Sequence, residues 1–148
     1  MNITKSVLIL LVITAGAIAG RSIDAATLPA GTMILIRTSH NIYARDPAGR
    51  KFDGTLARHI GSVPIGATVG GVVRSPWFTV GSTTRPLTLR LTQIVVRGKV
   101  IGIRSDDFEV DNTSPWRTQV RGIQVTGGAF LLPIGTILEF RLKEPVEI

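Results

Sequence analysis

The densest group of ionisable side chains is an acidic run at residues 106–111, Asp-Asp-Phe-Glu-Val-Asp. On a strand, Asp107, Glu109 and Asp111 share one face, because successive side chains point to opposite faces. Carboxylates arranged in this way can bind a hard cation, but the run lacks the glycine and glutamate that a helix–loop–helix calcium site needs at its sixth and twelfth positions. We therefore expect a solvated edge strand whose charges discourage pairing, with no metal ion and no cofactor. The three carboxylates are the metal candidates of the chain.

The sequence contains few residues that could carry out nucleophilic catalysis. His40 and His59 are the only histidines, and the chain has no cysteine. A hydrolase needs a nucleophile on a defined turn beside a base and an orienting acid, and no G-x-S-x-G elbow occurs. Two histidines fall short of the usual zinc ligand set. We expect a non-enzymatic protein.

Cationic and aromatic side chains are the better candidates for binding. Guanidinium groups suit phosphates and carboxylates, and five cations fall on the first two predicted strands and their connection: Arg37, Arg45, Arg50, Lys51 and Arg58. If they share a face, they predict a site for an anionic ligand, whereas alternating cations form a solvated surface. Trp77 and Trp116 each follow Ser-Pro. Each tryptophan could form part of a platform that binds sugar rings or a partner. The alternative is a core anchor, because Trp is mostly buried on average.

The N-terminus resembles an export signal. Lys5 precedes an uninterrupted apolar run at residues 7–14, and residues 17–19 give the small-x-small pattern of a cleavage site. The apolar stretch is shorter than the roughly 20 residues of a membrane-spanning helix, so cleavage is favoured over a retained anchor. We expect a signal peptide within residues 1–25, cut after Ala19 or near Ala25, and one domain over residues 27–148 that is not a transmembrane protein after cleavage.

The charge balance is basic, with 17 Lys and Arg against 10 Asp and Glu. Because the leader directs the domain out of the cytoplasm, nucleic acid is not the expected partner. An anionic envelope glycan or lipid headgroup fits the charge better. The alternative is that the positive charge only keeps the domain soluble.

Three related stretches organise the chain. Residues 28–37 read LPAGTMILIR, residues 132–141 read LPIGTILEFR, and residues 63–72 read VPIGATVGGV. Each begins with Pro and Gly placed as at i+1 and i+3 of a type I turn, followed by residues that favour a strand. In the last copy, Leu138, Phe140 and Leu142 share one face. Similar first and last strands are expected to lie side by side and to close a sheet.

Further strands are predicted at residues 52–60, 87–96 and 100–104, the last two joined by a tight turn in which Gly98 takes a positive φ. Eight prolines and sixteen glycines argue against long helices. The sequence predicts an all-β fold: a small closed or partly closed β-barrel, or barrel-like sandwich, of about six to eight strands.

This order of segments resembles two groups of proteins. The PAGT-strand, the VPIGATVGGVV segment, LTLRLTQIVVRGKVIGI and the terminal LLPIGTILEFRLKEPVEI are similar to small exported β-domain proteins of unknown function from acidobacteria-like genomes. More distantly, the pattern resembles the C-terminal β-barrel of the conjugation and type IV secretion outer-core protein family. That resemblance implies a periplasmic barrel within an oligomeric ring.

Together these features predict an exported protein of the periplasm or cell surface. Its expected role is that of a structural or assembly module of the cell envelope, which contacts another envelope protein or further copies of itself. The alternative is a binding module for an anionic envelope glycan or lipid headgroup.

Overall fold

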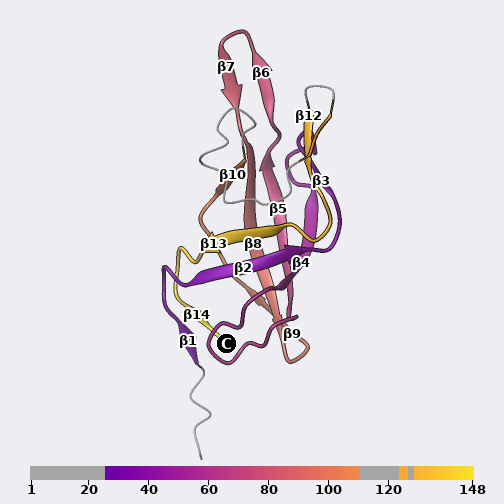
Figure 1. Cartoon of the computed structure of the whole chain (residues 1–148). Coiled ribbons are helices and arrows are strands. Elements are labelled where there is room, and N and C mark those ends of the chain that lie inside the picture. Colours follow the sequence, from indigo (N-terminus) through magenta and orange to yellow (C-terminus); the bar gives the residue numbers. More distant parts are fainter. Residues whose placement is uncertain (1–25, 111–123, 127–128) are drawn as a thin grey trace, which may run out of the picture.

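The computed structural model describes residues 26–110, 124–126 and 129–148, which form strands and no helix (Figure 1). The predicted all-β class is confirmed. The strands are β1 (Thr27–Leu28), β2 (Met33–Thr38), β3 (Ile42–Tyr43), β4 (Lys51–Leu56), β5 (Thr68–Ser75), β6 (Phe78–Val80), β7 (Thr83–Arg85), β8 (Leu87–Val96), β9 (Lys99–Gly102), β10 (Phe108–Val110), β11 (Gln124–Thr126), β12 (Ala129–Leu132), β13 (Ile137–Arg141) and β14 (Val146–Glu147).

Seven of these strands form one antiparallel sheet in the order β10-β8-β5-β4-β2-β13, with β9 also paired to β8. The first long strand and the last one are neighbours, as expected from their similar sequences. They pair from Ile137 opposite Arg37 to Arg141 opposite Met33. Figure 1 shows β2 and β13 crossing in front of β5 and β8, so the sheet is strongly curled.

The two ends of the curled sheet meet at one point. An isolated bridge joins Ser105, between β9 and β10, to Leu142, just after β13. The Asp106 N–H donates to the Arg141 carbonyl, and the Lys143 N–H donates to the Arg104 carbonyl, each at 2.8 Å. The structure is therefore barrel-like and partly closed, in agreement with the predicted fold.

The repeated Pro-x-Gly stretches form three matched turns, but of a different type from the one predicted. The Thr136 N–H donates to the Pro133 carbonyl at 3.1 Å, and Gly135 has a φ of +86°. Proline therefore occupies position i, and glycine occupies position i+2, where a type II turn needs a positive φ. The type I assignment was wrong because glycine's conformational freedom, rather than proline's fixed φ, determines where this turn lies.

Each turn also binds the end of a neighbouring strand, which explains why the sequence repeats. Gly31 N–H donates to the Leu142 carbonyl, and the Leu142 N–H donates back to Thr32. The second copy does the same at the other end of the strand pair, since Gly135 donates to Thr38 and Thr38 donates to Thr136. The middle copy repeats the arrangement with Gly66, Leu56 and Ala67. The repeated sequence therefore forms the same turn three times, and each turn holds the end of a strand in place by backbone hydrogen bonds.

The hydrophobic core lies inside the curled sheet. The predicted inward faces are confirmed, since Leu138, Phe140 and Leu142 are buried and so are Leu87, Leu89 and Leu91. Near the middle of the core Phe52 packs over Gly71, where the register between β5 and β8 shifts. The side chains that are almost wholly enclosed are Phe52, Phe140, Ile34, Ile36, Ile42, Leu56, Leu87, Leu89, Leu91, Ile94, Leu132 and Leu138.

Hairpins extend from both ends of the barrel. At the lower end in Figure 1, β8 and β9 are joined through Arg97 and Gly98, both with positive φ. This confirms the predicted tight turn. At the upper end β6 and β7 form a hairpin that projects beyond the barrel (Figure 1). Beside it lies a separate small sheet in the order β11-β12-β3, and β1 pairs with β14.

Candidate functional site

The five predicted cations are all exposed but do not gather at one place. Arg37 lies on the outer face of β2, where its Nη1 donates to the Gly135 carbonyl at 3.5 Å. Arg37 lies opposite Thr55 of β4. Lys51, the first residue of β4, is four positions before Thr55, which is about 13 Å along the strand at the usual rise. Asp53 lies between them on the same face and offsets their charge.

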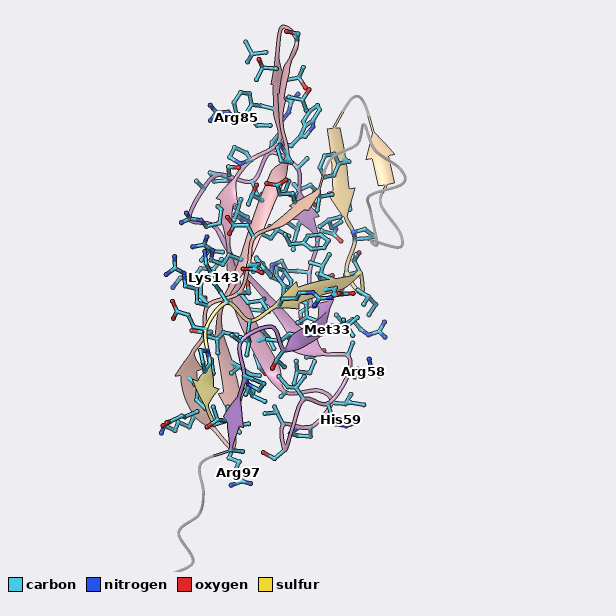
Figure 2. All side chains as sticks on the ribbon, turned by 90° about the vertical axis from the view of Figure 1, so that its left-hand side faces the viewer. Met33, Arg58, His59, Arg85, Arg97 and Lys143 are labelled. Carbon is cyan, nitrogen blue, oxygen red and sulfur yellow. The ribbon has the colours of Figure 1, made fainter. Side chains whose placement is uncertain are left out.

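The remaining cations lie in the loops. Arg50 forms an ion pair with Asp46 at 3.8 Å, and Arg45 reaches a groove beside Trp77. Arg58 follows β4 and lies beside His59, far from the hairpin residue Arg85 (Figure 2). The arrangement is that of separate solvated cations, and the assignment of these residues to an anionic ligand stays a prediction.

Trp77 lies where the barrel meets the projecting hairpin. Only 9% of the residue is exposed, its backbone N–H donates to the Ala44 carbonyl at 2.7 Å, and its ring stands edge-on to Phe130 at 5.9 Å. Among the described residues, the buried indole Nε1 has no hydrogen-bond partner. Trp77 thus anchors the core at this end, and its proposed ligand-binding role stays a prediction. Trp116 lies outside the described residues.

A shallow groove runs along the base of the hairpin, lined by Arg45, Pro76, Trp77, Phe78 and Thr79. Above it, the Arg85 guanidinium lies 5.2 Å from the centre of the Phe78 ring. Val80, at the tip, is 67% exposed. We call this groove and the hairpin above it the apical surface. Apart from the Ser-Pro-Trp motif, no pattern in the amino-acid sequence predicted this surface.

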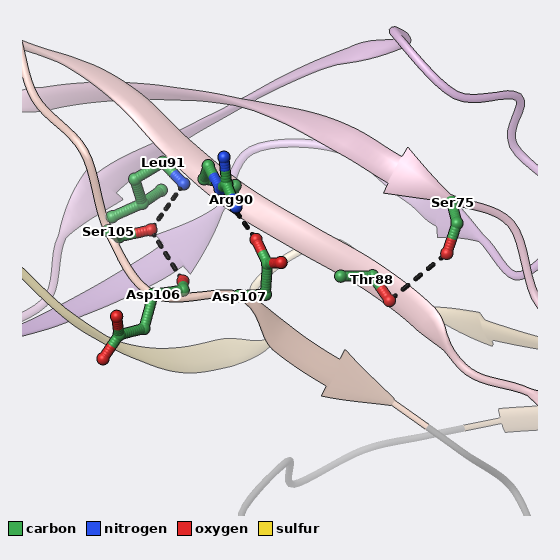
Figure 3. A network of polar contacts seen from close by, with 7 residues as sticks. All are labelled: Ser75, Thr88, Arg90, Leu91, Ser105, Asp106 and Asp107. Atoms are coloured by element: carbon green, nitrogen blue, oxygen red, sulfur yellow. Dashed lines mark hydrogen bonds and ion pairs between the residues drawn. The ribbon is translucent and has the colours of Figure 1, made fainter. Parts of the chain in front are cut away.

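Within the acidic run, residues Phe108–Val110 form β10, which lies at the end of the sheet, as predicted, and pairs with β8. Asp107 accepts a hydrogen bond from Arg90 Nε at 2.7 Å (Figure 3). Phe108 and Val110 turn toward the core, whereas Glu109 is exposed. Within the described residues no group of three or more acidic, His or Cys side chains could hold a metal ion. Asp111 lies outside those residues.

A gap opens between β10 and β13, and we call it the seam. It is lined by Asp106, Asp107, Phe108, Glu139, Phe140 and Arg141. At its closed end the buried Ser105 Oγ accepts from the Leu91 N–H and donates to the Asp106 carbonyl, each at 2.9 Å (Figure 3). Sequence reasoning assigned Asp107 to a charged edge strand but missed Glu139, because only the long-range closure of the sheet brings the two together.

The exposed histidines form no catalytic arrangement with the described residues. His40 lies in the turn after β2, and His59 follows β4. No buried hydroxyl or carboxylate pairs with either one among the hydrogen bonds and ion pairs of the described residues. Both are best described as turn residues.

The fold is similar to that of a secretion-system component. The structure of ComB10, of the Com type IV secretion system of Helicobacter pylori, matches with a TM-score of 0.50 and 14% sequence identity, over 82% of this chain and 89% of that chain. At this identity the likeness shows the fold alone, consistent with the distant resemblance expected from the sequence. No protein-family model matches the chain, and no curated protein matches it.

The described part of the chain contains no helix that is long and apolar enough to span a bilayer. Both the leader assignment and its cleavage site concern residues 1–25, outside the described part of the chain. They stay predictions.

Proposed function

We propose that this protein is a non-enzymatic structural or assembly module of the cell envelope, exported to the periplasm or cell surface, and that it works through protein–protein contacts. The apical surface is the observation that carries the proposal. The fold similarity to ComB10 supports it, because that protein belongs to the Com type IV secretion system of Helicobacter pylori.

The composition of the apical surface is typical of a protein interface. Protein interfaces are enriched in aromatic residues and Arg, and their strongest contacts centre on such side chains in pockets. Here Arg45, Trp77 and Phe78 line one groove, and Arg85 stacks on Phe78. A single exposed apolar residue means little, but Val80 stands at the tip of a hairpin directly above this groove.

A projecting apolar tip and an aromatic groove on the same end make the apical surface self-complementary. Two copies related by a two-fold axis can each insert Val80 into the groove of the other. Such isologous contacts are the commonest in homo-oligomers. We therefore assign a second copy of this chain as the first partner of the apical surface.

Two charge substitutions test the assignment by sedimentation velocity on the protein purified from cells that express the whole chain. Val80→Glu places a charge in the contact and is expected to weaken self-association at least tenfold. Val100→Glu is the matched control, because Val100 is similarly exposed, at 59%, on the hairpin at the opposite end.

Equal sedimentation of the two variants would contradict the apical contact. A monomer in the unsubstituted protein, together with salt-sensitive retention on an anionic polymer, would instead favour a binding module for an envelope glycan or lipid headgroup.

A further inference from the structure

We propose that the seam accepts an extended, basic segment of a partner protein, which adds to the sheet as a strand along β13. The inference rests on the proposed function only in that the chain acts through protein contacts. It concerns a different surface and a different partner from the apical contact.

The first argument is the unpaired backbone of β13. The Arg141 carbonyl accepts from Asp106, so the polar backbone groups of Arg141 point into the seam. Because these groups alternate between the two sides of a strand, those of Glu139 and Ile137 point the same way. β13 pairs with β2 on its other side only, and no backbone bond of the described residues satisfies the seam side of Glu139 or Ile137.

The facing strand leaves an edge of its own. The Leu91 N–H donates to Ser105 Oγ, and the Ser105 N–H donates to the Leu91 carbonyl. The polar backbone groups of Leu91 therefore point toward the β10 side, and so do those of the alternate residue Leu89. Leu89 lies opposite Phe108, so the polar backbone groups of Glu109 point away from β8 and toward the seam. Figure 1 shows β13 crossing over β8 while β10 runs along it. The two edges therefore diverge beyond their junction instead of pairing, and strand addition is the interaction that such edges offer.

The second argument is charge. Three of the ten acidic residues of this basic protein line the seam, namely Asp106, Asp107 and Glu139, and the exposed Glu109 follows on β10. Arg90 Nε lies 2.7 Å from Asp107 Oδ1 and offsets the charge of that carboxylate, and Arg141 Nη2 lies 3.8 Å from Glu139 Oε1. The carboxylates of Asp106 and Glu109 have no cation within ion-pair distance among the described residues. Like-charge repulsion disfavours an acidic strand here, whereas a basic one is favoured.

The third argument is the inner wall. Phe108 and Phe140 contact each other across the seam with their ring centres 5.5 Å apart. Phe108 is only partly buried, so its ring is available to a side chain that points inward from an added strand. Side chains alternate along such a strand. The seam therefore fits a segment with basic residues on its outer face and apolar residues on its inner face.

Three labelled peptides test the proposal by fluorescence anisotropy with the whole purified protein. The first alternates lysine with valine over eight residues. The second has the same sequence with N-methyl groups on alternate amides, and the third replaces lysine by glutamate. Strand addition predicts binding of the first peptide and at least tenfold weaker binding of the other two. Equal binding of the N-methylated peptide would overturn the proposal, because charge alone would then explain the affinity.

Variants locate the site and separate it from the apical contact. Glu139→Lys is expected to weaken the lysine peptide at least tenfold, whereas Glu147→Lys makes the same charge change on the exposed side of β14 and is expected to have little effect. Equal losses in the two variants would place binding elsewhere. Val80→Glu is expected to leave peptide binding unchanged, so failure here and failure of the proposed function are distinguishable.

Amide hydrogen exchange gives an independent readout. In the free protein the Glu139 N–H is expected to exchange quickly, and the N–H groups of Leu138 and Phe140, which face β2, slowly. The lysine peptide is expected to protect Glu139. Slow exchange of Glu139 in the free protein would show that the edge is already covered, and would refute the proposal.

Discussion

A methyl group added at Gly71 tests the packing of the barrel interior. The Cβ of Gly71→Ala would lie 2.3 Å from Phe52 Cζ and 2.6 Å from the Arg90 carbonyl oxygen. Phe52 is 2% exposed, so its ring is enclosed on all sides, and the carbonyl belongs to the backbone of β8. Neither neighbour can withdraw without moving the core.

The size of the effect follows from two opposing contributions. Overpacking a core costs about 1–3 kcal/mol, and contacts this short with a backbone atom place Gly71→Ala at the upper end, about 3 kcal/mol. Replacing glycine by alanine within a strand returns about 0.5–1 kcal/mol through the lower entropy of the unfolded chain. The net loss is about 2 kcal/mol, or about 8 °C in Tm for a domain of roughly 120 residues.

Urea and thermal unfolding followed by circular dichroism measure this loss. Gly102→Ala is the matched control, since nothing lies within 4 Å of the added Cβ there, and its effect is expected to stay within about 0.5 kcal/mol. In a Phe52→Leu background, which lacks the Cζ and Cε1 atoms, Gly71→Ala is expected to cost less. If Gly71→Ala proves as harmless as Gly102→Ala, the described packing of Phe52 over β5 is wrong.

Three other substitutions test the turns, the closure and the apical anchor, each by the same unfolding measurements. Gly135→Ala forces a φ of +86° on an alanine that meets nothing within 4 Å, so backbone strain alone is expected to cost about 1–2 kcal/mol; no loss would contradict the type II turn. Ser105→Ala leaves the Leu91 N–H without its hydroxyl acceptor in a fully buried site, at a cost of about 1–3 kcal/mol, whereas Ser62→Ala, at an exposed loop position, is expected to be neutral; similar stabilities would show that the hydroxyl does not secure the junction. Trp77→Ala is expected to cost about 3–5 kcal/mol, and Trp77→Phe clearly less, because phenylalanine keeps a ring against Phe130 and removes the indole N–H that has no described partner; equal losses would contradict the core-anchor description.

Local patterns in the sequence predicted much of the fold. Alternation predicted the buried faces of β8 and β13, and Gly98 predicted the β8–β9 hairpin, because both depend on neighbouring residues alone. The match between residues 28–37 and 132–141 predicted that β2 and β13 pair. The predicted turns were placed one residue too early, and their type was therefore wrong. Proline and glycine each favour several turn positions, and only the backbone conformation decides between them.

The candidate surfaces could not be predicted in the same way. Glu139 and Asp107 lie 32 positions apart, and only the closure at Ser105 and Leu142 brings them to one seam. The five cations lie close in sequence, but β2, β4 and their loops direct them to different parts of the surface. The β6–β7 hairpin has short strands of mixed polarity, so its projection from the barrel left no periodic signal.

The solution mass of the purified protein, measured by light scattering at low and moderate salt, tests the central claim most directly. Insertion of the apolar Val80 side chain into the groove of a second copy predicts a discrete oligomer at both salt concentrations, because screening weakens charge contacts far more than apolar ones. A clean monomer at both concentrations would contradict an assembly module built on self-association.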